Sequence, residues 1–449
     1  MATYSTTNIN ATLPKVIERG VNMKVAQSRF KRELDKVQTI NNVNPSGLNS
    51  PYTVSENNTA FAVAEGGPIL SGSAPEYALG VVQLRQHWSS MVWTGALERI
   101  QNQYLTQLQR DPRYEGRPLA SLMKGAGNLA VRDLAFSTLK MYGRRENFFA
   151  LQGTEKSAIG VVTGLPGSNV AQFSWDTTKQ GNRLFDKDQW IQFFSPGGVQ
   201  RVGGLPSAGS SKYSTVSTAV DKTPASGATG PVQFDLLPSD VAVGDTAVFR
   251  NSYGLMPEGF IFYVDDTGSF KGIARSTDPA QFASVITRLS GSPTIAPSHF
   301  REQLSQMESK MGYGVPLAVQ IWLNKTQYYN FESQIYTTPF IRNLNAGQAE
   351  KIDMAAPQMV WDGRELMKDS DVPPGDVDFI NMLTWRKVQQ TALQAYEFDG
   401  GTLVKNVYNS YGEPLDTKQS TIFSEYNWDC VDPRSNGRIE GFAFNRIHV

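Results

Sequence analysis

The chain has 449 residues, of which 40% are hydrophobic and 11% aromatic, so we expect a folded protein with two or three lobes. Its 42 basic and 42 acidic residues give zero net charge, which disfavours a dedicated nucleic-acid-binding protein with its basic excess. The single cysteine, Cys430, excludes an intrachain disulfide and a cysteine-rich metal site.

Two kinds of membrane signal are not found in the sequence. The N-terminal residues contain no apolar core flanked by basic residues, so we expect no signal peptide. No apolar run reaches about 18 residues, the length that a membrane-spanning helix needs. The sequence therefore predicts no membrane partner.

The first part of the chain is polar and then becomes strand-like. Residues 1–75 are rich in Asn, Ser, Thr, Gly and Pro, and we expect neighbouring subunits to order such an arm. The stretch 77–93 alternates like a strand, with Val82, Leu84 and Trp88 on one side and Gln83, Arg85 and His87 on the other. Residues 55–77 are expected to form the other arm of a long, weak hairpin.

Residues 118–147 form the clearest helix in the sequence. Pro118 suits a first turn, and apolar residues from Leu119 to Leu134 recur at three- and four-residue spacing. A second face carries the basic stripe Lys124, Arg132, Lys140 and Arg144. This stripe is either a solvated helix face or a surface that contacts packed nucleic acid through its phosphates.

The middle of the chain predicts a loop followed by a β module. Small and turn-forming residues dominate 195–231, which indicates an exposed loop or a lobe boundary. Residues 232–275 are expected to form a compact β module with turns at Gly244-Asp245 and Thr267-Gly268.

Helices and strands alternate in the last third. Asp278, Pro279 and Gln281 predict the start of a helix that carries Phe282, Val285, Ile286 and Leu289 inward and ends near Gly291. A second helix is expected to bury Phe300, Leu304, Met307 and Met311 and to end at Gly312. A buried strand at 316–323 follows, then a helix capped by Asn324 with Gln327 as its box partner, then strand-like pieces over 358–428.

The chemistry-bearing residues do not form a catalytic or metal-binding pattern. His87, His299 and His448 lack ligand spacing, and phosphate, dinucleotide and hydrolase motifs are not found. The carboxylate pairs Asp265-Asp266 and Asp369-Asp371 lie in turn-like surroundings. We therefore predict no catalytic residue, no cofactor and no metal, although two carboxylates distant in sequence could still form a glycosidase site.

The order of these features resembles the HK97-like major capsid proteins of tailed bacteriophages over nearly the whole chain. EYALGVVQLRQHWSSMVW is similar to the end of the family's extended E-loop, and PLASLMKGAGNLAVRDLAFSTLKMYGRRENFFALQG to its spine helix. MVWDGRELMKDSDVPPGDVDFIN is similar to strands that close the axial and peripheral domains. The resemblance implies an α+β fold, divided into an N-terminal arm (1–50), an E-loop (51–95), a peripheral domain with spine helix (96–165), an axial domain (166–350) with a β insertion at about 232–275, and return strands (351–449).

The same resemblance implies a structural, non-enzymatic function. It predicts a subunit, made in the host cytoplasm, that forms pentamers and hexamers of a virion shell around double-stranded DNA. A portal protein, a separate scaffolding protein and a decoration or cement protein are the implied partners. Some members cross-link an E-loop lysine to a neighbour, but this sequence has no lysine between Lys36 and Lys124, so we expect a noncovalent shell.

Three alternatives remain open. An encapsulin-type shell shares the implied fold but encloses cargo enzymes, and a tail-tube or baseplate protein belongs to the same structural class. A β-rich carbohydrate-active enzyme would show a cleft with two facing carboxylates.

Overall fold

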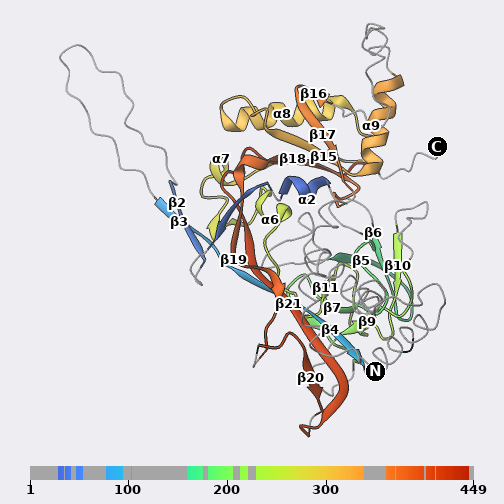
Figure 1. Ribbon diagram of the computed structural model, residues 1–449. Helices are drawn as coiled ribbons and strands as arrows, with labels where there is room; N and C mark the ends of the chain where they lie inside the picture. Colours follow the sequence, from blue (N-terminus) through green and yellow to red (C-terminus); the bar gives the residue numbers. More distant parts are fainter. Residues whose placement is uncertain are drawn as a thin grey trace, which may run out of the picture. The chain divides into compact units, whose positions relative to one another are not determined.

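The computed structural model describes residues 29–34, 36–41, 47–53, 77–94, 103, 159–174, 181–205, 213–220, 229–337, 360–369, 371–398, 401–409 and 411–443. The chain divides into two compact units. One unit comprises Met1–Lys31, Arg85–Glu146 and Gln389–Tyr426, and the other Arg32–Leu84, Asn147–Val388 and Asn427–Val449. Among these described residues helices and strands both occur and strands predominate, so the predicted α+β class is confirmed (Figure 1).

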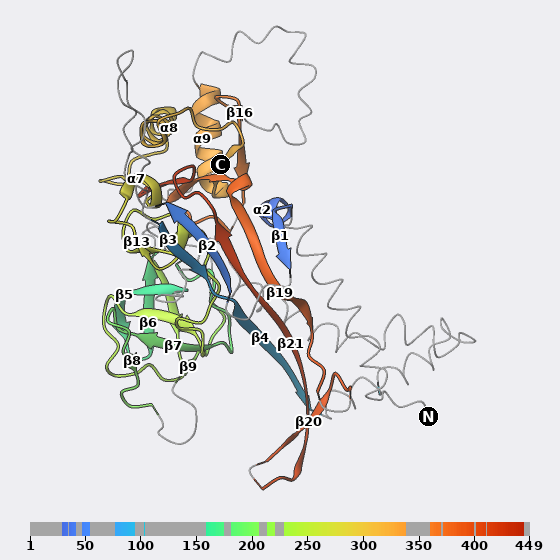
Figure 2. The same cartoon turned by 90° about the vertical axis from the view of Figure 1, so that its left-hand side faces the viewer.

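Long antiparallel strands characterise the first unit. They are β4 (Arg85–Thr94), β19 (Trp385–Ala395), β20 (Lys405–Tyr408) and β21 (Pro414–Cys430), of which β19 begins and β21 ends in the second unit. β21 pairs with β4 from Thr417↔Thr94 to Tyr426↔Arg85 and with β20 near its start. The first residues of β21 and strand β20 together form a two-stranded ribbon (Figures 1 and 2).

The second unit contains a six-stranded sheet in the order β14-β22-β18-β15-β17-β16. These strands are β14 (Val285–Arg288), β15 (Val319–Leu323), β16 (Val360–Trp361), β17 (Arg364–Lys368), β18 (Asp376–Asn381) and β22 (Gly437–Glu440). Helices α8 (Pro297–Met311) and α9 (Lys325–Thr337) cover one face of the sheet (Figure 1). The side chains of Phe300, Met307, Ile321, Phe331 and Phe379 are fully buried in the core between them.

Most predictions for this region are confirmed. α8 buries the four residues expected of it and ends at Gly312, whose φ of 72° is the left-handed conformation that glycine tolerates. Asn324 caps α9, because its Oδ1 accepts a hydrogen bond from the Thr326 amide at 3.1 Å. The predicted box partner is wrong, since the Gln327 amide donates to the carbonyls of Pro374 and Ala443 instead.

The predicted helix from Asp278 to Gly291 is mostly wrong. Asp278 does cap a helix, accepting hydrogen bonds from the amides of Ala280 and Gln281, but α7 (Pro279–Phe282) is a single turn. Val285–Arg288 instead forms β14, parallel to β22. Three consecutive β-branched residues favour a strand, and pairing with a strand near the C-terminus overrides the local helical spacing.

A closed β-barrel with its own core occupies residues 159–249 of the second unit. Its strands are β5 (Gly160–Gly167), β6 (Val170–Ser174), β7 (Trp190–Phe194), β8 (Gln200–Arg201), β9 (Ser214–Thr215), β10 (Thr229–Gln233) and β11 (Thr246–Phe249). The ring runs β10-β6-β5-β11-β7-β9, and a bridge from Val216 to Phe234 closes β9 onto β10. Phe173, Phe185, Phe193 and Phe234 fill its interior.

The barrel corrects the expectation of a compact β module at 232–275. β10 and β11 pair with β5, β6 and β7, which precede them in the chain, so residues 232–275 do not form one separate β module. The two-residue strands at Ser269–Phe270 and Ile273–Ala274 do pair with each other within this range. The segment 195–231, expected as an exposed loop or a lobe boundary, supplies β8, β9 and the start of β10. The predicted turns at Gly244 and Gly268 are correct, with φ of 95° and 74°.

The remaining elements are short. They are α2 (Arg29–Leu34), β1 (Gln38–Asn41), β2 (Leu48–Thr53), β3 (Tyr77–Val82), α6 (Phe260–Tyr263), β12 (Ser269–Phe270), β13 (Ile273–Ala274) and the 3-10 helix η3 (Met382–Thr384). The predicted helix 118–147 and residues 54–76 of the expected E-loop lie outside the described residues. No described helix is long and apolar enough to cross a membrane.

Candidate assembly surfaces

The β2–β3 ribbon is a two-stranded sheet in the described part of the chain. Its antiparallel register runs from Leu48↔Val82 to Thr53↔Tyr77. Pro51 lies within β2 and cannot donate a ladder hydrogen bond, as is typical of an edge strand. Leu79 is 58% exposed. A ribbon of two strands is marginally stable alone, so its conformation depends on what holds its base.

A buried charge cluster holds the ribbon at Tyr52, which lies on β2 opposite Ala78 of β3. This anchored part of the ribbon is its base. The Lys271 ammonium donates a hydrogen bond to the Tyr52 hydroxyl and forms an ion pair with Asp429, and the side chains of Lys271 and Asp429 are 0% exposed. Arg386 donates from Nε to the second Asp429 oxygen at 3.0 Å. Two cations therefore contact one buried carboxylate. A carboxylate inside a protein is costly unless it is paired in this way.

Aromatic rings surround the ribbon base. The Tyr52 ring meets Phe270 and Phe282 edge to face, each at 5.8 Å between centroids. Burial raises the pKa of the Tyr52 hydroxyl, although Lys271 acts in the opposite direction. The hydroxyl therefore stays protonated, and the ribbon is fixed to the β12–β13 hairpin by packing and by hydrogen bonds.

Two glycines allow the ribbon strands their close approach. Gly47 has a φ of 96°, and a Cβ there would lie 2.2 Å from the Val82 carbonyl oxygen. A Cβ on Gly80 would lie 2.7 Å from the Tyr52 ring. Neither position accommodates a side chain without moving the ribbon.

The predicted strand over 77–93 is interrupted at residues 83 and 84, so Val82 belongs to β3 and Trp88 to β4. Along β4 the buried side chains are His87, Met91 and Trp93, whereas Trp88 is 39% exposed. The alternation is as predicted, but the buried face is the one that carries His87.

An aromatic row lies on the exposed face of the first unit's sheet. Trp88 stacks on Phe423 at 4.8 Å between centroids and meets Tyr396 at 5.1 Å, and Tyr396 meets Phe398 at 5.2 Å. The ammonium of Lys405 lies 4.7 Å from the Phe398 ring centroid. Aromatic side chains in such a row are typical of protein interfaces.

The tip of the β20–β21 ribbon is organised by Asn409. Its Oδ1 accepts hydrogen bonds from the amides of Tyr411 and Glu413, and its Nδ2 donates to the Glu413 carboxylate, each at 2.9 Å. This turn presents Tyr411, which is 89% exposed, beside Tyr408 at 58%. A rigid loop with exposed tyrosines loses little entropy on binding, so the tip is a candidate contact.

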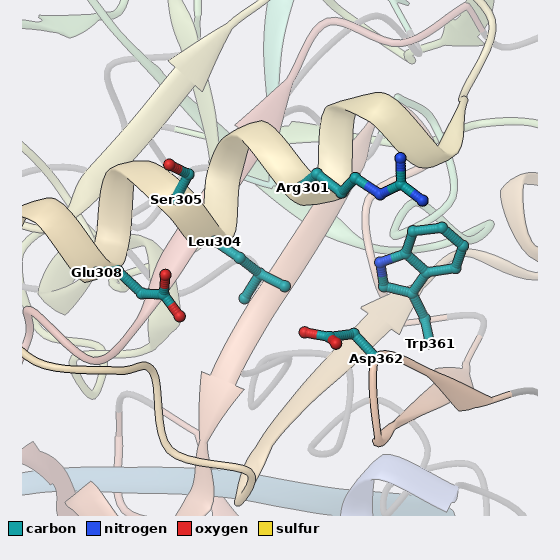
Figure 3. Close-up of a pocket in the computed structure, with 6 residues that line it drawn as sticks. All are labelled: Arg301, Leu304, Ser305, Glu308, Trp361 and Asp362. Carbon is teal, nitrogen blue, oxygen red and sulfur yellow. The ribbon is translucent and has the colours of Figure 1, made fainter.

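A surface groove of about 420 Å³ lies between α8 and the β16–β17 turn (Figure 3). Arg301, Leu304, Ser305, Glu308, Trp361 and Asp362 line it, and the Arg301 guanidinium carbon lies 5.4 Å from the Trp361 ring centroid. The groove has two carboxylates, Glu308 and Asp362: Glu308 is exposed, and Asp362 is paired with Arg364 and has a 69% exposed side chain. The groove therefore does not bury a carboxylate for acid-base chemistry.

The chemistry-bearing residues singled out from the sequence have local structural roles where they are described. His87 is buried in β4, and His299 Nδ1 accepts a hydrogen bond from the Ala296 amide at the start of α8. Arg288 bridges Asp265 and Asp266, and Asp369 accepts from the Asp371 amide in a turn. Within the described ranges, no group of three His, Cys, Asp or Glu residues could hold a metal ion.

The basic stripe and His448 lie outside the described residues, so Lys124, Arg132, Lys140 and Arg144 stay a prediction. The cluster of Lys271, Asp429 and Arg386 was missed, because its members are distant in sequence and no local motif joins them. The one local signal is the Lys271-Gly272 pair, whose φ values of 52° and 87° form the β12–β13 turn.

Comparison with known proteins returns similar structures only. No protein-family model and no curated protein match the chain. It is similar to a chain of the cyanophage A-1(L) capsid asymmetric unit, with a TM-score of 0.47, 9% identity and 93% of each chain covered. A Gordonia phage Cozz chain gives a TM-score of 0.40 and 8% identity, covering 92% of this chain and 87% of that one. A chain of the mature capsid of bacteriophage PhiM1 gives 0.38 and 8%, covering 90% and 84%. Identities and TM-scores this low assign no function to the chain.

Proposed function

We propose that this chain is the major capsid protein of a tailed bacteriophage, which assembles through pentamers and hexamers into an icosahedral shell around double-stranded DNA. The observation that carries the proposal is the β2–β3 ribbon, a two-stranded element fixed at its base by the buried Lys271–Asp429 ion pair and by Arg386. A rigid base supports a ribbon that is otherwise marginally stable, as expected of an arm completed by a neighbouring subunit.

Two further features support self-association. The aromatic row on the first unit and the Tyr411 tip both present residue types that are enriched at interfaces. In a closed shell, many such modest contacts act together and make the assembly stable. Two of the similar structures, from cyanophage A-1(L) and bacteriophage PhiM1, are capsids, which is the class that the sequence resemblance names, but the proposal rests on the features of this chain.

The remaining parts of the proposal come from the sequence. The division by residue range into arm, E-loop, peripheral domain, axial domain and return strands, without the separate insertion at 232–275, follows from the resemblance. The shell position in the virion and contact of the basic stripe with packaged DNA follow from it as well. A portal protein, a separate scaffolding protein and a decoration protein are its proposed partners. The shell is proposed to be noncovalent, because residues 37–123 contain no lysine. Ladders of linked subunits after boiling particles in denaturant would contradict a noncovalent shell.

Electron microscopy of the purified full-length protein tests the function. We expect closed icosahedral particles, or pentameric and hexameric rings. Particles that hold nucleic acid would support a phage capsid, whereas folded protein inside would indicate an encapsulin-type shell. A protein that stays monomeric at high concentration and also in the presence of scaffolding protein would contradict self-assembly.

A further inference from the structure

Asp376 and Asp378 are buried side by side on one face of the six-stranded sheet. They lie two residues apart on β18, so their side chains point to the same face. Across the antiparallel pair with β22, Asp376 lies opposite Glu440 and Asp378 opposite Arg438. The two aspartates are 0% and 1% exposed.

Within the part of the chain that the structure describes, neither aspartate side chain has a hydrogen-bond or ion-pair partner. None of their four carboxylate oxygens accepts a hydrogen bond from a described residue. A buried carboxylate that keeps its charge normally accepts several hydrogen bonds or contacts a cation directly. Four oxygens without a donor are therefore an unfavourable environment for two charged carboxylates.

The surrounding charges do not compensate two further anions. From β22, Arg438 forms an ion pair with Glu440 and its Nε and Nη1 lack acceptors. From β14, Arg288 lies 3.8 Å from Glu440 and 2.7 Å from Asp266, with Asp265 at 4.0 Å. On the other side, β15 places the uncharged Trp322 opposite Asp378. Three carboxylates thus face one buried guanidinium, which is already paired.

We propose that Asp376 and Asp378 form a proton-binding pair, neutral in the folded chain, whose deprotonation in alkaline solution separates β22 from β18. Burial raises the pKa of both carboxyls, that of Asp378 to about 8, and the Arg438 guanidinium opposes this rise without cancelling it. The pair belongs to a single chain, so the inference holds whether or not the chain forms a shell.

The direction of the pH effect follows from proton linkage. A carboxyl with a raised pKa in the folded state binds its proton more tightly than in the unfolded chain. The stability that this binding supplies is complete below the ordinary carboxylate pKa and is lost as pH rises through about 8. We therefore expect the folded chain to weaken progressively from mildly acidic to alkaline pH.

Asparagine variants test the inference, because an amide has the shape and neutrality of the protonated acid. We would measure the urea midpoint of the unassembled full-length chain between pH 5 and pH 9, as wild type, Asp376→Asn, Asp378→Asn and the double variant. Asp235→Asn, at an exposed position of the barrel, is the matched control. The expected result is a midpoint that falls toward pH 9 in wild type and control and stays flatter in the double variant.

Two outcomes would overturn the pair. If the urea midpoint changes equally with pH in wild type and the double variant, the aspartates bind no extra protons in the folded chain. Asparagine variants that are less stable than wild type even at pH 9 would show that the charged forms stabilise the sheet. If the double variant does not fold, the single variants carry the same comparison. Infrared spectra of the wild type provide a second readout. The proposal requires a band of protonated carboxyl groups that disappears above pH 8, and its absence at lower pH would overturn the proposal.

Discussion

Lys271 and Asp429 form an ion pair in which both side chains are fully buried. Lys271 lies in the β12–β13 turn and Asp429 near the end of β21, so the pair joins two distant parts of the second unit. The lysine also contacts Tyr52 of the β2–β3 ribbon through its ammonium group. The position of the ribbon base therefore depends on a charge that is removed from water.

Replacing Lys271 by methionine tests this dependence. The variant leaves Asp429 buried with Arg386 as its remaining partner, so we expect a loss toward the lower end of the roughly 3–5 kcal/mol typical of a broken buried ion pair. Urea denaturation measures the loss, and amide hydrogen exchange should increase in β2 and β3. Lys187→Met, at an exposed position, is the control. A loss no larger than that of the control would contradict the role of the pair.

Gly47 and Gly244 form a matched pair for testing the ribbon geometry. Their φ values are 96° and 95°, but a Cβ at Gly47 would lie 2.2 Å from the Val82 carbonyl oxygen, while nothing lies within 4 Å at Gly244. Alanine at either position costs about 1 kcal/mol or more in backbone strain. We expect Gly47→Ala to cost clearly more and to raise hydrogen exchange in β3. Equal losses of thermal stability in the two variants would show that the close approach does not matter.

The success of sequence reasoning depends on whether the deciding contacts are local. The end of α8 at Gly312, the Asn324 cap and the turn at Gly244 depend on a few adjacent residues, and all were predicted correctly. Val285–Arg288 was predicted as a helix because its spacing of apolar residues fits one. Its partner strand β22 is distant in sequence, at Gly437–Glu440, so the pairing cannot be read from the local pattern. The barrel was missed for the same reason, since the bridge from Val216 to Phe234 closes a ring that no local pattern encodes. The buried cluster at Lys271 likewise depends entirely on distant contacts.

Cys430 is expected to be unreactive in the folded chain. Its side chain is fully buried, and burial raises the pKa of the thiol, although the nearby Lys271 acts in the opposite direction. Since the thiolate is the reactive species, a disulfide reagent at pH 8 should label Cys430 only as urea unfolds the chain. Thr218→Cys in a Cys430→Ser background places a thiol at an exposed position and should react at once. Rapid labelling of native Cys430 would contradict its burial.

The ribbon tip gives a prediction that separates assembly from folding. Tyr411 is 89% exposed, so Tyr411→Ala should change the free energy of unfolding by less than about 0.5 kcal/mol. If the tip is a contact between subunits, the same variant should reduce particle formation, because an interface tyrosine can contribute about 2 kcal/mol or more.

Asn409→Ala extends the test of the tip to its internal hydrogen bonds. This variant removes the acceptor for the amides of Tyr411 and Glu413, so assembly should weaken while the Tyr411 ring is still present. Tyr313→Ala, at a 53% exposed position after α8, is the control. Light scattering and electron microscopy at matched protein concentration measure the yield of particles. Normal yields from both tip variants would show that the tip does not contribute to assembly. The aromatic row on β4 and β21 would then be the next surface to change, starting with Trp88.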